Sequence, residues 1–253
     1  MVERDTGVTL PPFTFGSLFA GIGGFDLGLE RAGMECKWQV EIDDFCNRVL
    51  EKHWPHVKRY RDVREVGKHN LEPVDLICGG FPCQPFSVAG ERKRTSDDRH
   101  LWPEVRRVVQ ELHPRWFAGE NVPGIDDGYE MVLDEVCADL EAIGYAVAPP
   151  LEIPACAVDG DHLRFRVFII ANSKRDSIQG GAIDAEEGKE KPRKEQLAGL
   201  LLPASRASVS IARTYRDGHG VQSRMDAHRN KALGNAVVPQ VVEMIGRAIM
   251  AAK

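Results

Sequence analysis

Cys83 is the residue of this sequence that is best placed to act as a nucleophile. It stands in the run Gly79-Gly80-Phe81-Pro82-Cys83-Gln84-Pro85, directly after the apolar segment 74–78. The apolar segment predicts a buried strand closed by a tight glycine turn, so the thiol would lie at the strand's carboxyl end. The two prolines restrict the backbone around the Cys-Gln pair and would present the thiol rigidly. A proline-rich surface turn with an incidental cysteine is the alternative that this run leaves open.

A carboxyl group and two guanidinium groups are predicted at other strand ends. Glu120 follows the apolar segment 116–119, and Arg164 and Arg166 open the apolar run 164–171. A thiol and a carboxyl at adjacent strand ends form a candidate catalytic constellation. Residues two apart on a strand share a face, so the two arginines would offer two fixed guanidinium forks. An exposed strand edge that carries arginines is the alternative.

Upstream of these groups, a strand, a glycine turn and a helix predict a nucleotide-type binding site. The segments are 13–19, Ala20-Gly21-Ile22-Gly23-Gly24 and 25–31. Glycines let a ligand approach the backbone, and a helix N-terminus offers free N–H groups. The spacing is not that of the dinucleotide Gly-x-Gly-x-x-Gly pattern, and a purely structural turn stays open at this point.

Two acidic residues at later strand ends favour the cofactor interpretation. Glu41 follows a strand predicted at 37–40, about 20 residues after the glycine turn, where such folds hydrogen-bond a ribose. Asp62 ends a strand predicted at 57–60, where it would reach the base of the ligand. For Asp62, a helix cap or a turn acid is the competing interpretation.

The remaining pattern predicts an α/β fold with a mostly parallel, doubly wound sheet. Segment 88–100 is a polar, basic loop that could form a mobile lid or simply be solvated. Segment 172–228 has little periodicity and predicts a loop-rich insert, partly disordered near 176–195. We expect helices at 101–112, 129–143 and 240–252, the last packed back on the sheet, and a hairpin formed by strands 145–153 and 164–171.

Composition indicates a globular chain of 253 residues, with 43% apolar and 28% charged side chains. We expect no secretory peptide at the N-terminus and no membrane span. The net charge of −5 is unevenly divided, because residues 172–253 hold 14 basic and 9 acidic side chains against 19 and 29 in residues 1–171. A polyanion held at one face is compatible with that division. No two cysteines have Cys-x-x-Cys spacing, so we expect free thiols, of which five are structural: Cys36, Cys46, Cys78, Cys137 and Cys156.

Taken together and in order, these motifs resemble the cytosine-C5 DNA methyltransferase family, in a compact bacterial or phage form. The resemblance covers nearly all of the chain except 172–228. It rests on five motifs: Phe15 to Gly24, Pro82-Cys83-Gln84-Pro85-Phe86-Ser87, Glu120-Asn121-Val122, Arg164-x-Arg166, and Gly234-Asn235-Ala236-Val237-Val238-Pro239. It implies a Rossmann-like, S-adenosylmethionine-dependent methyltransferase fold with a small target-recognition insert.

The resemblance also implies a reaction and its residues. Cys83 would add to C6 of a flipped-out cytosine so that C5 can take the methyl group, while Glu120 binds the N3/N4 edge. Arg164 and Arg166 would hold the base and a phosphate. The DNA-binding residues would be Gln84, Ser87, Arg92, Arg94 and Arg99. The cofactor residues would be Phe19, Ala20, Gly21, Gly23, Gly24, Glu41, Ile42, Asp62, Leu101, Asn235 and Ala236, with no metal.

The same resemblance implies partners and a domain plan. Double-stranded DNA would be the substrate of a monomeric cytoplasmic enzyme without a membrane partner, and a restriction endonuclease would be a functional partner. The catalytic and cofactor-binding domain would be 1–171, the recognition region 172–228 and the returning C-terminal helix 229–253. The sequence departs from the family pattern at His162, at Ala236 and at 221–225, where a Phe-Pro-Asp segment is usual.

Two other functions remain open at this stage. The RNA-methylating branch of the fold would use the same Cys83 and Glu120, but the tetrapeptide it usually carries after its arginine motif is not visible. A non-catalytic S-adenosylmethionine-binding regulator would have no need for the intact cysteine, glutamate and arginine set.

Overall fold

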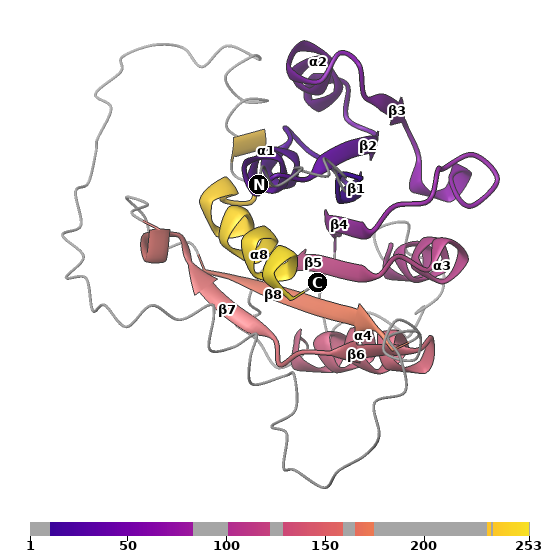
Figure 1. Cartoon of the computed structure of the whole chain (residues 1–253), viewed down its shortest axis with the longest axis vertical. Helices are drawn as coiled ribbons and strands as arrows, with labels where there is room; N and C mark the ends of the chain where they lie inside the picture. Colours follow the sequence, from indigo (N-terminus) through magenta and orange to yellow (C-terminus); the bar gives the residue numbers. More distant parts are fainter. Residues whose placement is uncertain are drawn as a thin grey trace, which may run out of the picture.

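The structure is a computed structural model, and Figure 1 shows it for the whole chain. Most of its helices and strands lie in residues 11–82, 101–121 and 129–158, and the C-terminal helix packs against them. The residues that the structure describes are 11–82, 101–121, 129–158, 165–174, 232–233 and 235–252.

An eight-stranded, mostly parallel sheet forms the centre of the molecule, with the order β3-β2-β1-β4-β5-β8-β6 and β7 paired to β8. Strands β1 to β5 run parallel, and β8 is antiparallel to its neighbours β5, β6 and β7. The predicted doubly wound α/β sheet is therefore confirmed. The strands are β1 Thr14–Leu18, β2 Glu35–Val40, β3 Lys58–Tyr60, β4 Leu76–Gly80, β5 Trp116–Asn121, β6 Tyr145–Val147, β7 Leu151–Pro154 and β8 Phe165–Ser173.

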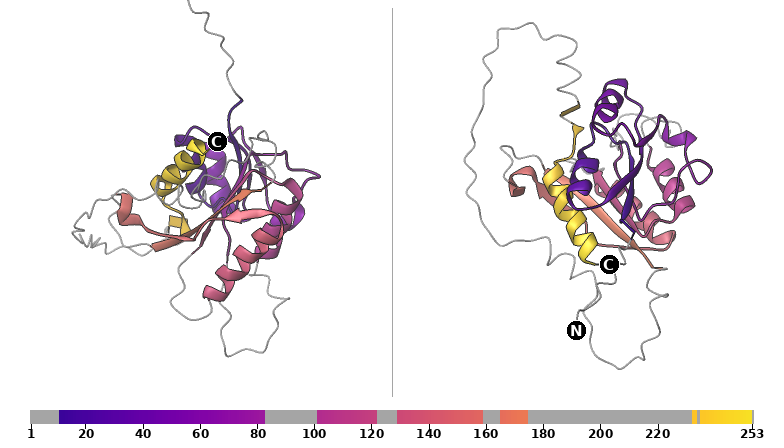
Figure 2. Two further views of the ribbon diagram at one scale, coloured as in Figure 1. Left: turned by 60° about the horizontal axis from the view of Figure 1, so that its bottom comes forward. Right: turned by 45° about the horizontal axis from the view of Figure 1, so that its top comes forward.

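Helices cover both faces of this sheet. Figure 2 shows α1 and α8 on one face, with α3 and α4 on the other. The helices are α1 Gly24–Arg31, α2 Asp44–His53, α3 Trp102–Leu112, α4 Tyr129–Ala142 and α8 Pro239–Ala251, with short 3-10 turns η1 Val63–Glu65 and η2 Ala155–Val158. Each of the helices predicted at 101–112, 129–143 and 240–252 is present within a residue or two of those bounds.

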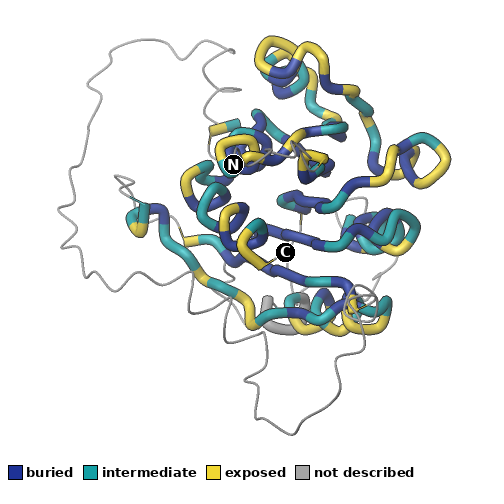
Figure 3. Tube along the Cα trace, viewed as in Figure 1, coloured by how far each residue is buried: buried dark blue, intermediate teal, exposed yellow. Residues whose placement is uncertain are grey.

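The central strands are apolar on both sides because both faces are covered. In β4, Leu76 and Cys78 enter the core beneath α1 and α8, while Ile77 enters the core beneath α3 and α4. All three side chains have no exposed surface. Figure 3 shows this burial as a continuous dark core through the middle strands. The uninterrupted apolar run at 74–78 thus reports a strand with two buried faces.

Helices α1 and α8 pack closely enough to require glycine. A Cβ atom on Gly28 would lie 2.6 Å from the Pro239 carbonyl oxygen and 2.6 Å from the Val242 Cβ. A Cβ atom on Gly246 would lie 2.8 Å from the Ala32 Cβ. The C-terminal helix is therefore fitted against the first helix of the chain, as well as lying on the sheet as predicted.

The reversed direction of β8 brings its first residues to the edge where the parallel strands end, called the carboxyl edge below. Phe168 pairs with Glu120 and Val167 pairs with Asn121, so Arg166 lies beside the last residues of β5. A parallel strand at this position would have brought its last residues there instead. The topology is what allows an arginine at the start of one strand to meet a glutamate at the end of another.

Two predicted local structures were wrong. Gly79 and Gly80 are the last residues of β4 and not a turn, because at each position a neighbouring strand comes too close for a side chain. A Cβ on Gly79 would lie 2.3 Å from the Leu18 carbonyl oxygen. The single strand expected at 145–153 is two strands, β6 and β7, since Pro149 and Pro150 lack the N–H that a ladder needs.

Candidate cofactor and catalytic site

The glycine turn after β1 has a backbone shape that only a few residue types adopt. Phe19 has φ 51°, Gly21 has φ 57° and Gly23 has φ 87°. The Gly23 N–H donates to the Ala20 carbonyl at 2.9 Å, and the Ala20 N–H donates to Val40 of β2 at 3.1 Å. Among the described residues, a Cβ atom on Gly21 would meet nothing closer than the Phe19 carbonyl oxygen at 4.0 Å. The turn therefore leaves open space next to Gly21, where a ligand can approach the backbone.

Glu41 holds the glycine turn from the end of β2. Its Oε2 accepts the Gly21 N–H at 2.7 Å, and its Oε1 accepts the Asp43 N–H at 2.7 Å. Each carboxylate oxygen has a second lone pair that can still accept a hydroxyl hydrogen. Ile42, the next residue, is 61% exposed beside this carboxylate. The residue pair thus offers a polar acceptor and an apolar surface at the carboxyl edge.

Asp62 is the cap of η1, which was the competing interpretation of this residue. Its Oδ1 accepts the Arg64 N–H at 3.0 Å, and the Arg64 guanidinium donates to both carboxylate oxygens. These hydrogen bonds from Arg64 lower the pKa of Asp62. Asp62 follows β3, and Glu41 follows the neighbouring β2, so both carboxylates lie at the same edge of the sheet.

The start of the C-terminal segment closes over the glycine turn. A Cβ atom on Gly24 would lie 2.7 Å from the Val237 carbonyl oxygen and 2.8 Å from its Cγ1. The Ala236 N–H donates to Ala232 at 3.0 Å, which sets the turn before Val237. Asn235, which directly precedes Ala236 in the sequence, is exposed. Leu101 and Phe19 are both partly buried against the core under α3.

Glu120 and Arg166 form an ion pair with little access to water. Arg166 Nε lies 2.7 Å from Glu120 Oε1, and the two side chains are 15% and 8% exposed. The Arg166 Nη1 also donates to the Phe165 carbonyl at 2.7 Å. A Cβ atom on Gly80 would lie 2.6 Å from Glu120 Oε2. The last glycine of β4 therefore provides the space that the carboxylate of β5 occupies.

Phe81, two residues before Cys83, is fixed by contacts from β5 and α3. The Asn121 Nδ2 donates to its carbonyl oxygen at 3.5 Å. The centre of its ring lies 5.1 Å from the centre of the Trp102 ring, and the two planes are tilted by 42°. The Trp102 ring centre lies 6.1 Å from that of Phe117. The sequence identified the motif around Phe81 but not its support, because Trp102 looks like one more apolar residue of helix 101–112.

A buried polar cluster under the glycine turn was not predicted. Asp26 of α1 accepts hydrogen bonds from Ser17 of β1 at 3.2 Å and from Gln39 of β2 at 2.8 Å. All three residues have no exposed surface. Burial raises the pKa of Asp26 to about 6. The only available signal was an acidic residue three positions before the core residue Leu29, on the apolar side of the helix.

Several predicted site residues lie outside the described residues. They are Cys83, Arg164, Gln84, Ser87, Arg92, Arg94 and Arg99. Among the residues that the structure does describe, no group of three His, Cys, Asp or Glu side chains could hold a metal ion, and no helix is long and apolar enough to cross a membrane. A cavity of about 500 Å³ lies between α4 and the segment joining β6 to β7, and none of the predicted site residues that the structure describes lines it.

Comparison with known proteins agrees with this fold. M.HgiCII and M.HgiBI of Herpetosiphon aurantiacus, two type II methyltransferases, are 39% identical over 138 residues and 33% identical over 205 residues. The matches cover 53% and 79% of this chain but only 32% and 47% of those proteins, so the chain spans about a third to a half of their length. The Entamoeba histolytica methyltransferase EhMeth has the same fold, with a TM-score of 0.62 over 96% of this chain and 99% of that one at 15% identity.

A family model covers the whole sheet and most of the candidate site, except its residues 235–237. The model described as C-5 cytosine-specific DNA methylase matches residues 13–217, from β1 to beyond β8. The match includes the glycine turn, Glu41, Asp62 and the Glu120–Arg166 pair. The chain belongs to the C-5 cytosine-specific DNA methylase family.

Proposed function

We propose that this chain transfers a methyl group from S-adenosylmethionine to C5 of a flipped-out cytosine in double-stranded DNA. The observation that carries the proposal is the nearly buried Glu120–Arg166 pair. It lies beside the end of β4, the strand that leads into the Pro-Cys-Gln run. Family membership and the names of the relatives support the reaction class.

The glycine turn and the carboxylates around it fit S-adenosylmethionine. Open space at Gly21 admits a ligand, Glu41 retains lone pairs for ribose hydroxyls, and Ile42 offers an apolar face to a base. Asp62 would accept the adenine amine, while Phe19, Ala20, Gly23, Gly24, Leu101, Asn235 and Ala236 would complete the pocket. The group, when bound, supplies an electrophilic methyl on its sulfonium. The proposed chemistry uses no metal.

Cys83 would be the nucleophile. Cytosine C5 is a poor nucleophile on its own, so addition of the Cys83 thiolate to C6 moves electron density to C5. After C5 has been methylated, loss of its proton and departure of the thiolate from C6 restore the aromatic ring. The C5 proton would leave to a water molecule, which balances the reaction without a further protein base.

Glu120 would stabilise the base during attack, and Arg166 would orient Glu120. Glu120 would bind the N3/N4 edge of the base and keep N3 protonated, which reduces the negative charge that attack at C6 places on the ring. The Arg166 Nε contact at 2.7 Å and the space above Gly80 fix where the carboxyl group points. Arg164 would hold the neighbouring phosphate.

Residues 172–228 are proposed to select the DNA sequence, and 1–171 with the returning helix 229–253 to bind cofactor and perform the chemistry. Gln84, Ser87, Arg92, Arg94 and Arg99 would contact DNA. A restriction endonuclease is the proposed functional partner, since the relatives are named type II methyltransferases. We propose a monomer acting in the cytoplasm.

The test is methyl transfer by the full chain from labelled S-adenosylmethionine to cytosine-containing duplex DNA, with tRNA as the alternative acceptor. Cys83→Ser should abolish transfer while cofactor affinity is retained, and DNA containing 5-fluorocytosine should trap a covalent adduct on the wild type. Turnover by Cys83→Ser would contradict the mechanism. Preference for tRNA would move the enzyme to the RNA branch, and cofactor binding without transfer or adduct would favour a regulator.

A further inference from the structure

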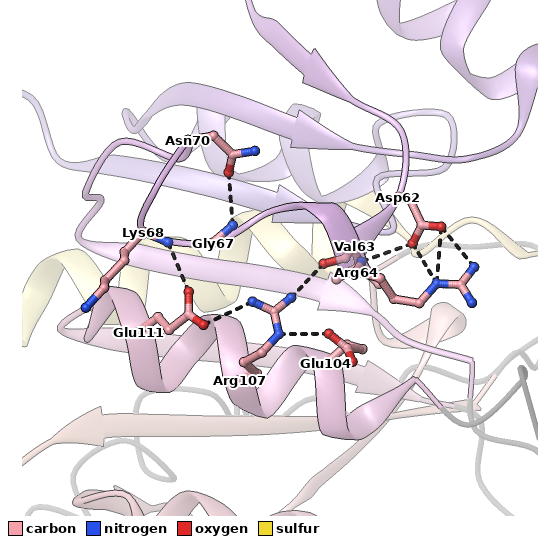
Figure 4. Close-up of polar contacts among 9 residues, drawn as sticks. All are labelled: Asp62, Val63, Arg64, Gly67, Lys68, Asn70, Glu104, Arg107 and Glu111. Carbon is pink, nitrogen blue, oxygen red and sulfur yellow. Dashed lines mark hydrogen bonds and ion pairs between the residues drawn. The ribbon is translucent and has the colours of Figure 1, made fainter. Parts of the chain in front are cut away.

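Both carboxylate oxygens of Asp62 are already engaged by Arg64. Oδ1 accepts the Arg64 backbone N–H and Nε, each at 3.0 Å. Oδ2 accepts Nε at 3.1 Å and Nη2 at 2.8 Å. A carboxylate has about four lone-pair positions, and three donor hydrogens of Arg64, with the Nε–H shared between both oxygens, already occupy most of them. Figure 4 shows the guanidinium lying across the carboxylate.

The backbone that carries Asp62 is fixed from α3. Arg107 Nη2 donates to the Val63 carbonyl at 3.0 Å, and Arg107 is itself held by Glu104 at 2.8 Å and by Glu111 at 3.1 Å. Glu111 also accepts the Lys68 N–H at 3.1 Å. Figure 4 shows this chain of contacts running from the helix to η1. The segment is therefore held in place, while the Arg64 side chain is 49% exposed and can change rotamer.

We propose that Arg64 competes with the adenine amine for Asp62, and thereby sets the affinity and the base selectivity of the cofactor site. The proposal rests on the proposed function, because it takes Asp62 as the adenine contact. The adenine amine is a donor, as the guanidinium is, so the two need the same lone pairs. A 6-oxo group is an acceptor, which gains a donor from Arg64 instead of losing one.

The size of the effect follows from exposure. Asp62 and Arg64 are 22% and 49% exposed, and ion pairs of this kind are weak. Removal of the Arg64 side chain should therefore raise the affinity for the cofactor by roughly one and a half to fivefold. Arg64 therefore weakens cofactor binding without preventing it.

The experiment is calorimetric titration of the full chain with S-adenosylhomocysteine and with its inosine analogue, which carries oxygen at position 6. S-adenosylhomocysteine has no net charge at neutral pH, so long-range charge effects are small. Arg64→Met and Arg64→Gln should each bind S-adenosylhomocysteine roughly one and a half to fivefold more tightly than wild type. Neither should gain affinity for the inosine analogue, so the preference for adenine should rise.

Two further variants test the cause. Lys58→Met removes the same charge from β3, where the ammonium lies 4.9 Å from the centre of the Tyr60 ring, and should leave the adenine preference unchanged. Asp62→Ala in the Arg64→Met background removes the acceptor and should remove the gain. Unchanged or weaker S-adenosylhomocysteine binding by both Arg64 variants overturns the competition and leaves the proposed function standing. Absence of binding by the wild type overturns the proposed function itself.

Discussion

Glu120 keeps a carboxyl group at the carboxyl edge although only 8% of its side chain is exposed. Taking a charge out of water is costly unless partners replace the solvent. Here Arg166 supplies the opposite charge at 2.7 Å, and the missing side chain of Gly80 supplies the room. Replacing Gly80 by alanine would therefore displace the carboxylate, even though glycine is not required there for its backbone angles.

Glu120 and Arg166 were recognisable in the sequence because each follows or opens an apolar run. The role of Gly80 was not recognisable, since it depends on the pairing of β4 with β5. Adjacent glycines suggested a turn, whereas the structure uses them for close approach between strands. The sequence shows that Gly80 has no side chain, but it does not show that the Glu120 carboxylate occupies the resulting space.

Asp26 gives a residue-scale prediction about pH. Its folded pKa of about 6 lies above the ordinary aspartate value of 3.8. The stability that comes from the protonated Asp26 is therefore present at low pH and is lost as the pH rises through about 6. Asn in its place can keep the Ser17 and Gln39 contacts and never ionises. Asp26→Asn should therefore be more stable than wild type at pH 7.5, by about 3 kcal/mol at most.

Urea unfolding at pH 5 and pH 7.5 measures this difference. The advantage of Asp26→Asn should grow by about 1–2 kcal/mol between the two values. Asp44→Asn, which changes an 80% exposed side chain on α2, is the control and should show little change. An advantage that stays constant with pH would mean that Asp26 is not the ionising group.

At the scale of elements, the contact between α1 and α8 decides whether the cofactor turn is complete. Val237 lies on Gly24, and α8 begins two residues later. The turn at the start of the chain is thus closed by residues near its end. The sequence predicted that the last helix returns to the sheet, but its precise partner depends on tertiary packing.

Gly28→Ala tests this contact. Alanine favours an isolated helix by about 0.5–1 kcal/mol, yet its methyl group would lie 2.6 Å from the Pro239 carbonyl oxygen. We expect a net destabilisation of about 1–3 kcal/mol, together with weaker S-adenosylhomocysteine binding, measured by urea unfolding and calorimetry.

Gly246→Ala is the matched variant on the other helix. Its methyl group would meet side-chain atoms of Ala32 and Leu29 at 2.8 Å and 3.1 Å, with no backbone atom among the nearest neighbours. Side chains yield more easily than a carbonyl, so it should cost less than Gly28→Ala. The reverse order would show that α8 is not held where the structure has it.

At the scale of the whole molecule, the candidate cofactor site draws on the ends of β1, β2 and β3 and on the start of α8. A ligand that contacts all of these elements binds the folded chain but not the unfolded chain. It should therefore raise the free energy of unfolding of the whole domain. S-adenosylhomocysteine at about 100 times its Kd should raise the free energy of unfolding by about 2.7 kcal/mol.

Urea unfolding with and without S-adenosylhomocysteine measures this effect. Glu41→Ala removes the acceptor of the Gly21 N–H and should abolish most of the gain. If the wild type bound S-adenosylhomocysteine without a rise in its free energy of unfolding, the cofactor site would lie on a part of the chain that unfolds separately. Equal stabilisation of the Glu41 variant would exclude the glycine turn as the site.

The antiparallel course of β8 has a consequence for anyone who would graft a different recognition segment onto this chain. The backbone N–H of Ser173 donates to the Arg115 carbonyl at the amino end of β5, whereas Val237 contacts Gly24 just beyond the carboxyl end of β1. The chain between Ser173 and Val237 must therefore connect the amino ends of the parallel strands with their carboxyl ends. The nine residues of β8 measure about 30 Å when extended. A transplanted segment shorter than about nine residues could not reconnect the chain, whatever DNA sequence it read.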